Sequence, residues 1–304
     1  MERNEVDFLE PSGPDWQRRP GIILAFLLAG IFVGLGVGNT LAALAILRSG
    51  VDFQLLLQGL EEGVSRKGRD AMRLATLLNH IFTFTVPALL VMIWAYREQW
   101  RQELRIHRSP NAGLLALGLL FLLLSFPVAQ YLYWWNLKLP LPEMLAEMER
   151  SANQMVKAFL VMDDPWELAF NVLTVGVVAA LGEELVFRGV VQPKLGQLFR
   201  NEVAAVWFTA IIFSTIHFQF AGFLPRMVLG AVLGYLYLWT RNLWIPFIAH
   251  FAFNALQIVA QYVYGDLMDQ FDPETMKQPH WATLVFPLAL LLLIGNEIQK
   301  RKNP

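Results

Sequence analysis

The chain has 304 residues, of which 56% are hydrophobic and only 16% are charged, and its formal net charge is −1. Soluble globular domains carry about 25% charged residues, so this deficit favours an integral membrane protein. The 22 Phe and 10 Trp residues exclude a disordered chain, and the near balance of 24 Lys and Arg against 25 Asp and Glu disfavours a nucleic-acid-binding protein. Because the chain has no Cys, disulfides, cysteine–zinc sites and thiol nucleophiles are excluded.

Apolar stretches of the length needed to cross a bilayer recur along the chain, and a helix needs about 20 such residues to do so. The candidate spans are residues 21–47, 74–96, 112–135, 166–187, 203–220, 224–239, 244–264 and 281–298. The fifth and sixth are short enough to form a re-entrant pair instead. We therefore predict an all-α, polytopic membrane protein with about eight transmembrane helices.

The Lys and Arg residues of the short loops predict the orientation of these spans. An even number of spans puts both termini on one side, which then holds 13 of the 24 Lys and Arg residues. A loop rich in Asp and Glu at 266–274 fits the opposite, outer side. We therefore expect both termini in the cytoplasm and the protein in the cell (inner) membrane.

The chain divides into segments of different composition. We expect a polar N-terminal tail at 1–20, N-terminal transmembrane helices at 21–140, an amphipathic helix at 141–163, a catalytic core at 164–265, and an acidic loop, a last transmembrane helix and a basic tail at 266–304. The amphipathic helix has Met-rich apolar positions at helical spacing and charged residues, Glu149 among them, on the opposite face. Such a helix either lies in the membrane interface or packs on its own protein.

Three charged residues interrupt residues 175–191, which are otherwise mostly apolar. A charge at the bilayer centre costs about 2.5–3.5 kcal/mol on insertion scales, so three of them need an explanation. Glu184 and Arg188 are four positions apart, the spacing of a helical ion pair, which either holds helices together or takes part in chemistry. Glu183 lies about 100° around the helix from Glu184 and lacks that partner. It is therefore the candidate catalytic acid or base.

Polar residues also interrupt later apolar spans. His217 follows Phe213 by one helical turn, and Asn254 follows His250 by one turn. A lone His in an apolar helix is more often a satisfied core residue, and we assign His80 in the second span to that class. A Glu, two His and an Asn on three polar-interrupted spans instead predict one site.

A Glu with two His can either bind a divalent metal or activate a water molecule without one. No HExxH motif occurs, but a zinc site built from Glu183, His217 and His250 on separate helices remains possible. Asn254 is better suited to donate to an oxyanion than to bind zinc. Ser214 ranks below bound water as a nucleophile. We therefore prefer attack by a water that Glu183 activates with help from His217.

The same residues carry a resemblance to a known family. The motifs EExxxR (Glu183, Glu184, Arg188), FxxxH (Phe213, His217) and HxxxN (His250, Asn254) occur in order and are similar to those of the CPBP family of intramembrane proteases, which includes the type II CAAX prenyl endopeptidases and the Abi proteins. The resemblance covers about residues 166–264, a third of the chain. It implies an eight-helix enzyme with a polar intramembrane cavity. It also implies that Glu183 and His217 activate water, that His250 and Asn254 form the oxyanion site, and that Glu184 and Arg188 support them.

We therefore predict an intramembrane endopeptidase of the glutamate type that needs no cofactor. Its expected partners are the lipid bilayer and a membrane-associated peptide or protein substrate, with prenylated CAAX-type substrates included, and no nucleic acid. Three alternatives remain open: a zinc-dependent protease with the same residues, a non-catalytic membrane immunity or partner-binding protein, and a transporter. The last is disfavoured because the sequence shows no internal repeat.

Overall fold

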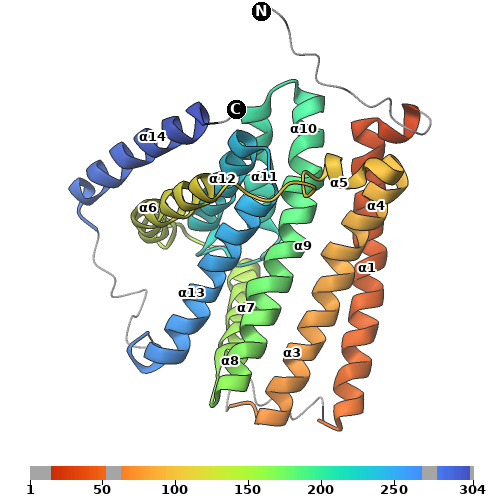
Figure 1. Ribbon diagram of the computed structural model, residues 1–304. Helices are drawn as coiled ribbons and strands as arrows, with labels where there is room; N and C mark the ends of the chain where they lie inside the picture. Colours follow the sequence, from red (N-terminus) through yellow and green to blue (C-terminus); the bar gives the residue numbers. More distant parts are fainter. Residues whose placement is uncertain (1–14, 53–62, 269–278, 302–304) are drawn as a thin grey trace, which may run out of the picture.

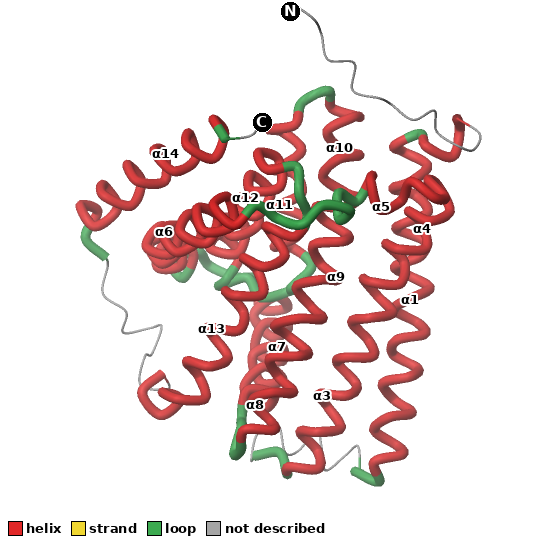
Figure 2. Tube along the Cα trace, viewed as in Figure 1, coloured by secondary structure: helices red, strands yellow, loops and turns green. Residues whose placement is uncertain are grey.

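The computed structural model describes residues 15–52, 63–268 and 279–301, and its regular structure there is helical, without a strand (Figures 1 and 2). The all-α prediction is confirmed for these ranges. The helices are α1 (Pro20–Ser49), α3 (Arg66–His80), α4 (Val86–Tyr96), α5 (Trp100–Glu103), α6 (Ala112–Asn136), α7 (Glu143–Leu160), α8 (Pro165–Asn171), α9 (Ala180–Glu184), α10 (Gln192–Phe199), α11 (Glu202–Thr215), α12 (Phe223–Thr240), α13 (Trp244–Met268) and α14 (Val285–Lys300). Short 3₁₀ helices occur at Asp15–Arg18, Arg97–Gln99 and Trp281–Leu284.

Six continuous helical segments are long and apolar enough to cross a membrane in the part of the chain that the structure describes. They are Pro20–Ser49, Arg66–Glu103, Ala112–Asn136, Pro165–Phe199, Phe223–Thr240 and Trp281–Lys300. Of the other two predicted spans, 203–220 is helical only as far as Thr215, in the 14-residue helix α11. The span 244–264 lies in α13, which is not among the six. The predicted number of eight is therefore approximate.

Side chains and prolines at helix starts explain several of the helix boundaries. Asn111 accepts a hydrogen bond from the Leu114 amide at the start of α6, and Asp164 accepts from the amides of Trp166 and Glu167 at the start of α8. These bonds satisfy amides that lack an intrahelical partner. Pro165, at the first position of α8, has no amide hydrogen to satisfy.

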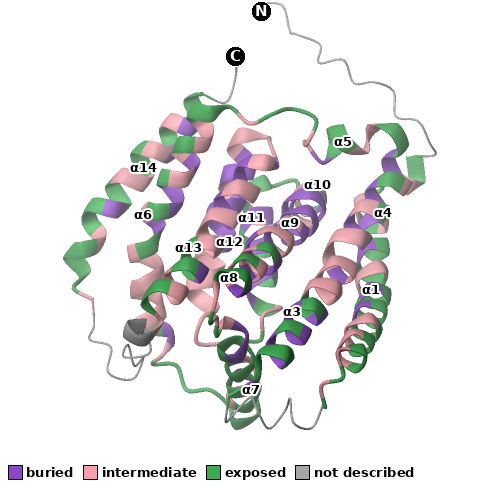
Figure 3. Ribbon diagram, turned by 60° about the horizontal axis from the view of Figure 1, so that its bottom comes forward, coloured by how far each residue is buried: buried purple, intermediate pink, exposed green. Residues whose placement is uncertain are grey.

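The long helical segment Pro165–Phe199 occupies the middle of the molecule (Figure 1). Two apolar cores lie beside it. The first joins α1 and α4 to residues 185–190 of this segment, and the second joins α6, α12, α13 and α14. Buried residues gather on α9, on the adjoining residues 185–190 and on α12, whereas α1, α6 and α14 present exposed residues outward (Figure 3). Many of these exposed residues are large and apolar, as a lipid-facing surface requires.

The central segment is not a uniform α-helix. Two π-helical stretches, Val172–Ala179 and Leu185–Val191, flank α9, and a third, Ile81–Thr85, connects α3 to α4. π-helical turns are rare and concentrate at functional sites. Here they lie on both sides of Glu183 and in the helix that packs against it.

A buried polar cluster connects α3 to α8. Arg69 and Arg73 both donate to the carboxylate of Glu167, and Arg73 also donates to Asn171 and to the backbone carbonyl of Val161. Because the buried guanidinium groups are paired with a carboxylate, their cost in an apolar surrounding is reduced. The cluster fixes the position of α3 along the central segment.

The amphipathic helix α7 packs partly on its own protein. Glu149, predicted on the charged face opposite the Met-rich one, is buried, and its carboxylate accepts from the amide of Ala221 in the turn between α11 and α12. This contact fits the alternative in which the helix packs on its own protein, because the turn offers an amide without another partner. Met144 and Met155 remain exposed on the same helix.

Some predictions fall outside the described residues. They concern the N-terminal tail up to residue 14, most of the acidic loop at 269–274, and the last residues of the basic tail at 302–304.

Candidate active site

Glu183 lies between two imidazole rings. Its Oε1 is 3.3 Å from Nε2 of His80, and its Oε2 is 3.7 Å from Nε2 of His250. The carboxylate is largely buried, so neighbouring donors compensate for the water it has lost. The assignment of His80 to the core was incomplete, because α3 brings this residue against α9. Since 103 positions separate the two residues, no local sequence pattern could reveal the contact.

Glu184 and Arg188 form the ion pair that their spacing predicts. Arg188 Nη1 donates to Glu184 Oε1 at 2.6 Å, and neither side chain reaches solvent. Arg188 Nη2 also donates to the Gly230 carbonyl at 2.8 Å, and the same Glu184 oxygen is 2.9 Å from His250 Nδ1. A continuous line of polar contacts therefore runs from α3 through α9 and α13 to α12.

His217 lies in the turn that follows α11, not inside an apolar helix as predicted. The helix ends at Thr215, and Phe218 adopts the left-handed backbone conformation with φ of 53°. The ring nitrogen Nδ1 of His217 is 2.7 Å from the Phe213 carbonyl. Because a carbonyl only accepts, Nδ1 carries the proton and Nε2 of the neutral ring is left as an acceptor.

Phe213 and Asn254 hold neighbouring groups in place. The buried Phe213 ring lies under the Arg188 guanidinium, 5.1 Å from its carbon to the ring centroid, and contacts the His217 ring edge-on. Asn254 donates from Nδ2 to the Val175 carbonyl at 3.0 Å. Since an amide has two N–H groups, one remains for another acceptor.

The four residues predicted to be catalytic line one cavity of about 540 Å³, together with residues of α6 and α12. These are Glu183, His217, His250 and Asn254. Arg226 and Tyr133 also line it, although neither belongs to one of the sequence motifs. The structure thus brings the three motifs to one place, with room for a small part of a substrate beside Glu183.

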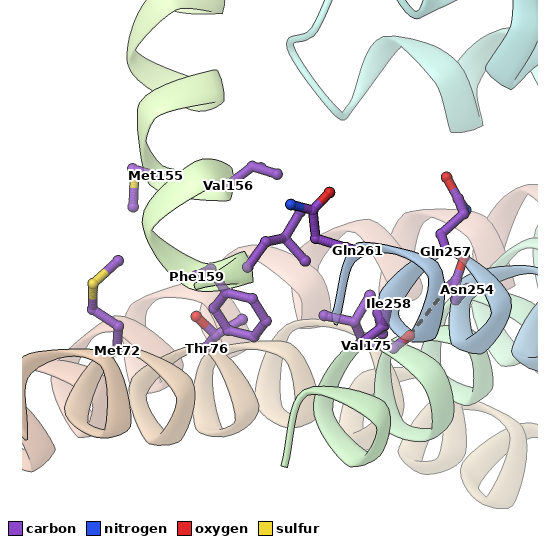
Figure 4. Close-up of a pocket in the computed structure, with 11 residues that line it drawn as sticks. Met72, Thr76, Met155, Val156, Phe159, Val175, Asn254, Gln257, Ile258 and Gln261 are labelled. Atoms are coloured by element: carbon purple, nitrogen blue, oxygen red, sulfur yellow. Dashed lines mark hydrogen bonds between the residues drawn. The ribbon is translucent and has the colours of Figure 1, made fainter. Parts of the chain in front are cut away.

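A second, mainly apolar pocket of about 480 Å³ adjoins this cavity (Figure 4). Asn254, Gln257 and Val175 line both. Its remaining wall comes from α3, α7 and α13, and in Figure 4 the side chains of Met72, Thr76 and Phe159 line its α3 and α7 side.

The zinc alternative concerns Glu183, His217 and His250, whose side chains line the same cavity. Among the described residues, no group of three or more His, Cys, Asp or Glu side chains is placed to hold a metal ion. His217 directs Nδ1 to a backbone carbonyl and His250 directs Nδ1 to Glu184, contacts that histidines binding a metal through Nε2 also make.

Helices of membrane-spanning length around a buried glutamate–histidine site define an integral membrane protein with a polar intramembrane cavity. Residues 165–256 of the chain match the family model described as type II CAAX prenyl endopeptidase Rce1-like. The resemblance drawn from the three motifs is thereby confirmed for this segment, which contains all seven motif residues and lies within the predicted core.

A curated relative covers a similar share of the chain. The uncharacterized protein YpbD of Bacillus subtilis (strain 168) is 30% identical over 107 residues, which are 33% of this chain and 52% of that protein. The chain thus spans about half the length of the curated relative it matches. No solved structure matches this chain.

Proposed function

We propose that the chain is an intramembrane endopeptidase in which Glu183 activates a water molecule. The observation that carries the proposal is the position of Glu183, buried on the wall of the cavity that His217, His250 and Asn254 also line. A carboxylate general base takes a proton from water as the water oxygen bonds to the scissile carbonyl carbon. His217 assists, because Nε2 of its neutral ring accepts a hydrogen bond.

The carbonyl oxygen gains negative charge in this step and needs donors. Asn254 offers its second amide N–H. His250, held on Glu184 through Nδ1, presents Nε2 toward Glu183 and donates from it when the ring is doubly protonated. The proton held by Glu183 then passes to the leaving amine, which balances the hydrolysis.

The proposed substrate is a membrane-associated peptide or protein, and prenylated CAAX-type substrates are included. Two features support an apolar substrate: the mainly apolar pocket beside the cavity and the match of residues 165–256 to the prenyl endopeptidase model. We also propose that the protein lies in the cell membrane with both termini in the cytoplasm.

The test compares peptide termini in the membrane proteomes of cells with the wild-type chain and with Glu183→Gln. The variant keeps the side-chain size but is a far weaker base, so we expect a loss of about 10²- to 10⁴-fold in cleavage. Termini that depend on the wild-type chain should disappear, while the variant reaches the membrane at equal abundance. Identical termini in both strains would reject the protease and favour a non-catalytic partner-binding protein.

The zinc-dependent alternative is decided on the purified wild-type protein. It requires stoichiometric zinc and loss of cleavage with a chelator, whereas the glutamate-type mechanism predicts that cleavage survives the chelator.

A further inference from the structure

We propose that His80 is a positioning residue for Glu183, and thus a third imidazole of the site. The inference rests on the proposed proteolysis. His80 lies on α3, far outside residues 165–256 and outside all three sequence motifs. Its Nε2 is 3.3 Å from Glu183 Oε1, within hydrogen-bonding distance.

The surroundings of His80 determine which ring nitrogen carries the proton. Nδ1 is buried without a hydrogen-bond partner, so a proton there would be a buried donor with no acceptor. A proton on Nε2 instead donates to the carboxylate of Glu183. The network therefore assigns His80 as a donor through Nε2, a bond to a charged acceptor and hence a strong one.

Two features hold the ring in this position. Phe84, one turn later, stacks on it at 4.5 Å between ring centroids. Gly182 lets α3 approach α9, because a Cβ there would lie 3.2 Å from the ring carbon Cε1 of His80. The π-helical stretch Ile81–Thr85 begins directly after His80.

The geometry explains what the contact does. Each oxygen of Glu183 faces one imidazole, Oε1 toward His80 and Oε2 toward His250. The hydrogen bond from His80 to Oε1 restrains the carboxylate from turning about its terminal torsion, with Oε2 left 3.7 Å from the His250 ring. The remaining lone pairs of the carboxylate stay directed at one place in the cavity, which is what a general base needs to meet its water.

The test replaces His80 by Phe, Gln and Asn in the full-length protein reconstituted in lipid vesicles. The substrate is a synthetic peptide that spans a cleavage site identified by the Glu183-dependent termini. We expect His80→Phe to lower kcat by about 10- to 100-fold, as expected for loss of a bond to a charged group, with KM nearly unchanged. His80→Gln should recover most of this loss, because its amide nitrogen reaches the position of Nε2.

His80→Asn is the matched control, since its shorter side chain places the amide near Nδ1 and leaves Glu183 without the bond. His107→Phe, in an exposed loop, controls for the loss of a histidine elsewhere. Thermal unfolding of each variant separates folding from positioning. If Gln, Asn and Phe have equal kcat, or if kcat follows thermal stability alone, the positioning role is wrong. If Glu183→Gln leaves the termini unchanged, the proposed protease itself fails.

A second readout needs no substrate. With ¹⁵N-labelled histidine, of which the chain has five, His80 should carry its proton on Nε2, and Glu183→Gln should shift the His80 signals. A proton found on Nδ1 would overturn the assignment.

Discussion

The buried ion pair of Glu184 and Arg188 has two separable roles, one in stability and one in the site. Neither side chain is exposed to solvent, so each charge depends on the other for compensation. Removing one partner leaves an unpaired buried charge, which typically costs about 3–5 kcal/mol, whereas replacing both can be neutral. Glu184 also contacts His250, so the same carboxylate serves the proposed oxyanion site.

We therefore expect Arg188→Met to lower the free energy of unfolding by about 3–5 kcal/mol. The double variant Glu184→Met/Arg188→Met should regain much of this stability and still fail to cleave, because His250 loses the acceptor for Nδ1. Thermal unfolding in detergent and cleavage of the identified peptide measure the two effects. Arg301→Met breaks the exposed pair with Glu297 and should change little. A double variant as unstable as Arg188→Met would contradict the separation.

At the scale of helices, the site depends on how closely α9 approaches the α3–α4 segment. Gly182 is the point of contact, where a Cβ would lie 2.8 Å from Thr85 Oγ1 and 3.1 Å from the Cβ of Phe84. A side chain there requires the helices to move apart, and this movement also separates His80 from Glu183.

Gly182→Ala should therefore reduce both stability and turnover. Overpacking of this kind costs about 1–3 kcal/mol. Adding Thr85→Ala removes the nearest atom and should restore part of the loss. Gly196→Ala is the control, since its Cβ would meet only ordinary contacts at 3.8 Å or more. Thermal unfolding and cleavage rates should show Gly182→Ala impaired and Gly196→Ala near the wild type. Equal behaviour of the two variants would mean that the close approach has no functional importance.

At the scale of the whole molecule, the hydropathy of the sequence predicted where the helices lie better than which residues contact one another. The expected span 112–135 agrees with α6, and the span 244–264 ends at Tyr264, where α13 departs from helical geometry. Apolar length alone determines such spans, because a backbone in lipid must satisfy its own hydrogen bonds. The three motifs likewise lie around one cavity. Polar side chains in apolar helices avoid the lipid and face the interior of the protein.

Some features that the sequence did not reveal are contacts between residues far apart in the chain, and others are local conformations without a sequence signal. His80 meets Glu183 across two helices, and Glu149 accepts from the amide of Ala221 in a distant turn. His217 leaves its helix where Phe218 takes a left-handed conformation that no Gly or Pro at that position announces. π-helical stretches have no periodicity of their own in the sequence, so they were not predicted either.

Contacts between loops support the predicted alternation of sides. The loop at 97–111 is joined to the turn at 241–243, where the Leu243 amide donates to the Arg105 carbonyl and Asn242 donates to the Arg108 carbonyl. Both segments belong to the more basic side. At the other end of the helices, Asn136 donates to the Phe220 carbonyl and Glu149 accepts from Ala221. The positive-inside rule then predicts the loop at 97–111 in the cytoplasm.

Single cysteines test this orientation directly, because the chain has no Cys of its own. Ser109 lies exposed in the basic loop, and Ser151 lies exposed on α7 at the opposite end. We expect a membrane-impermeant maleimide to label Ser151→Cys in intact cells and Ser109→Cys only in inverted vesicles. We expect the two positions to differ, because the hydrogen bonds above join the loop of Ser109 and the helix of Ser151 to opposite ends of the helices. Labelling of both from one side would contradict the alternation. A reversed pattern would keep the alternation and place the basic loops outside, which would show that the bias of 13 Lys and Arg residues among 24 does not orient this protein.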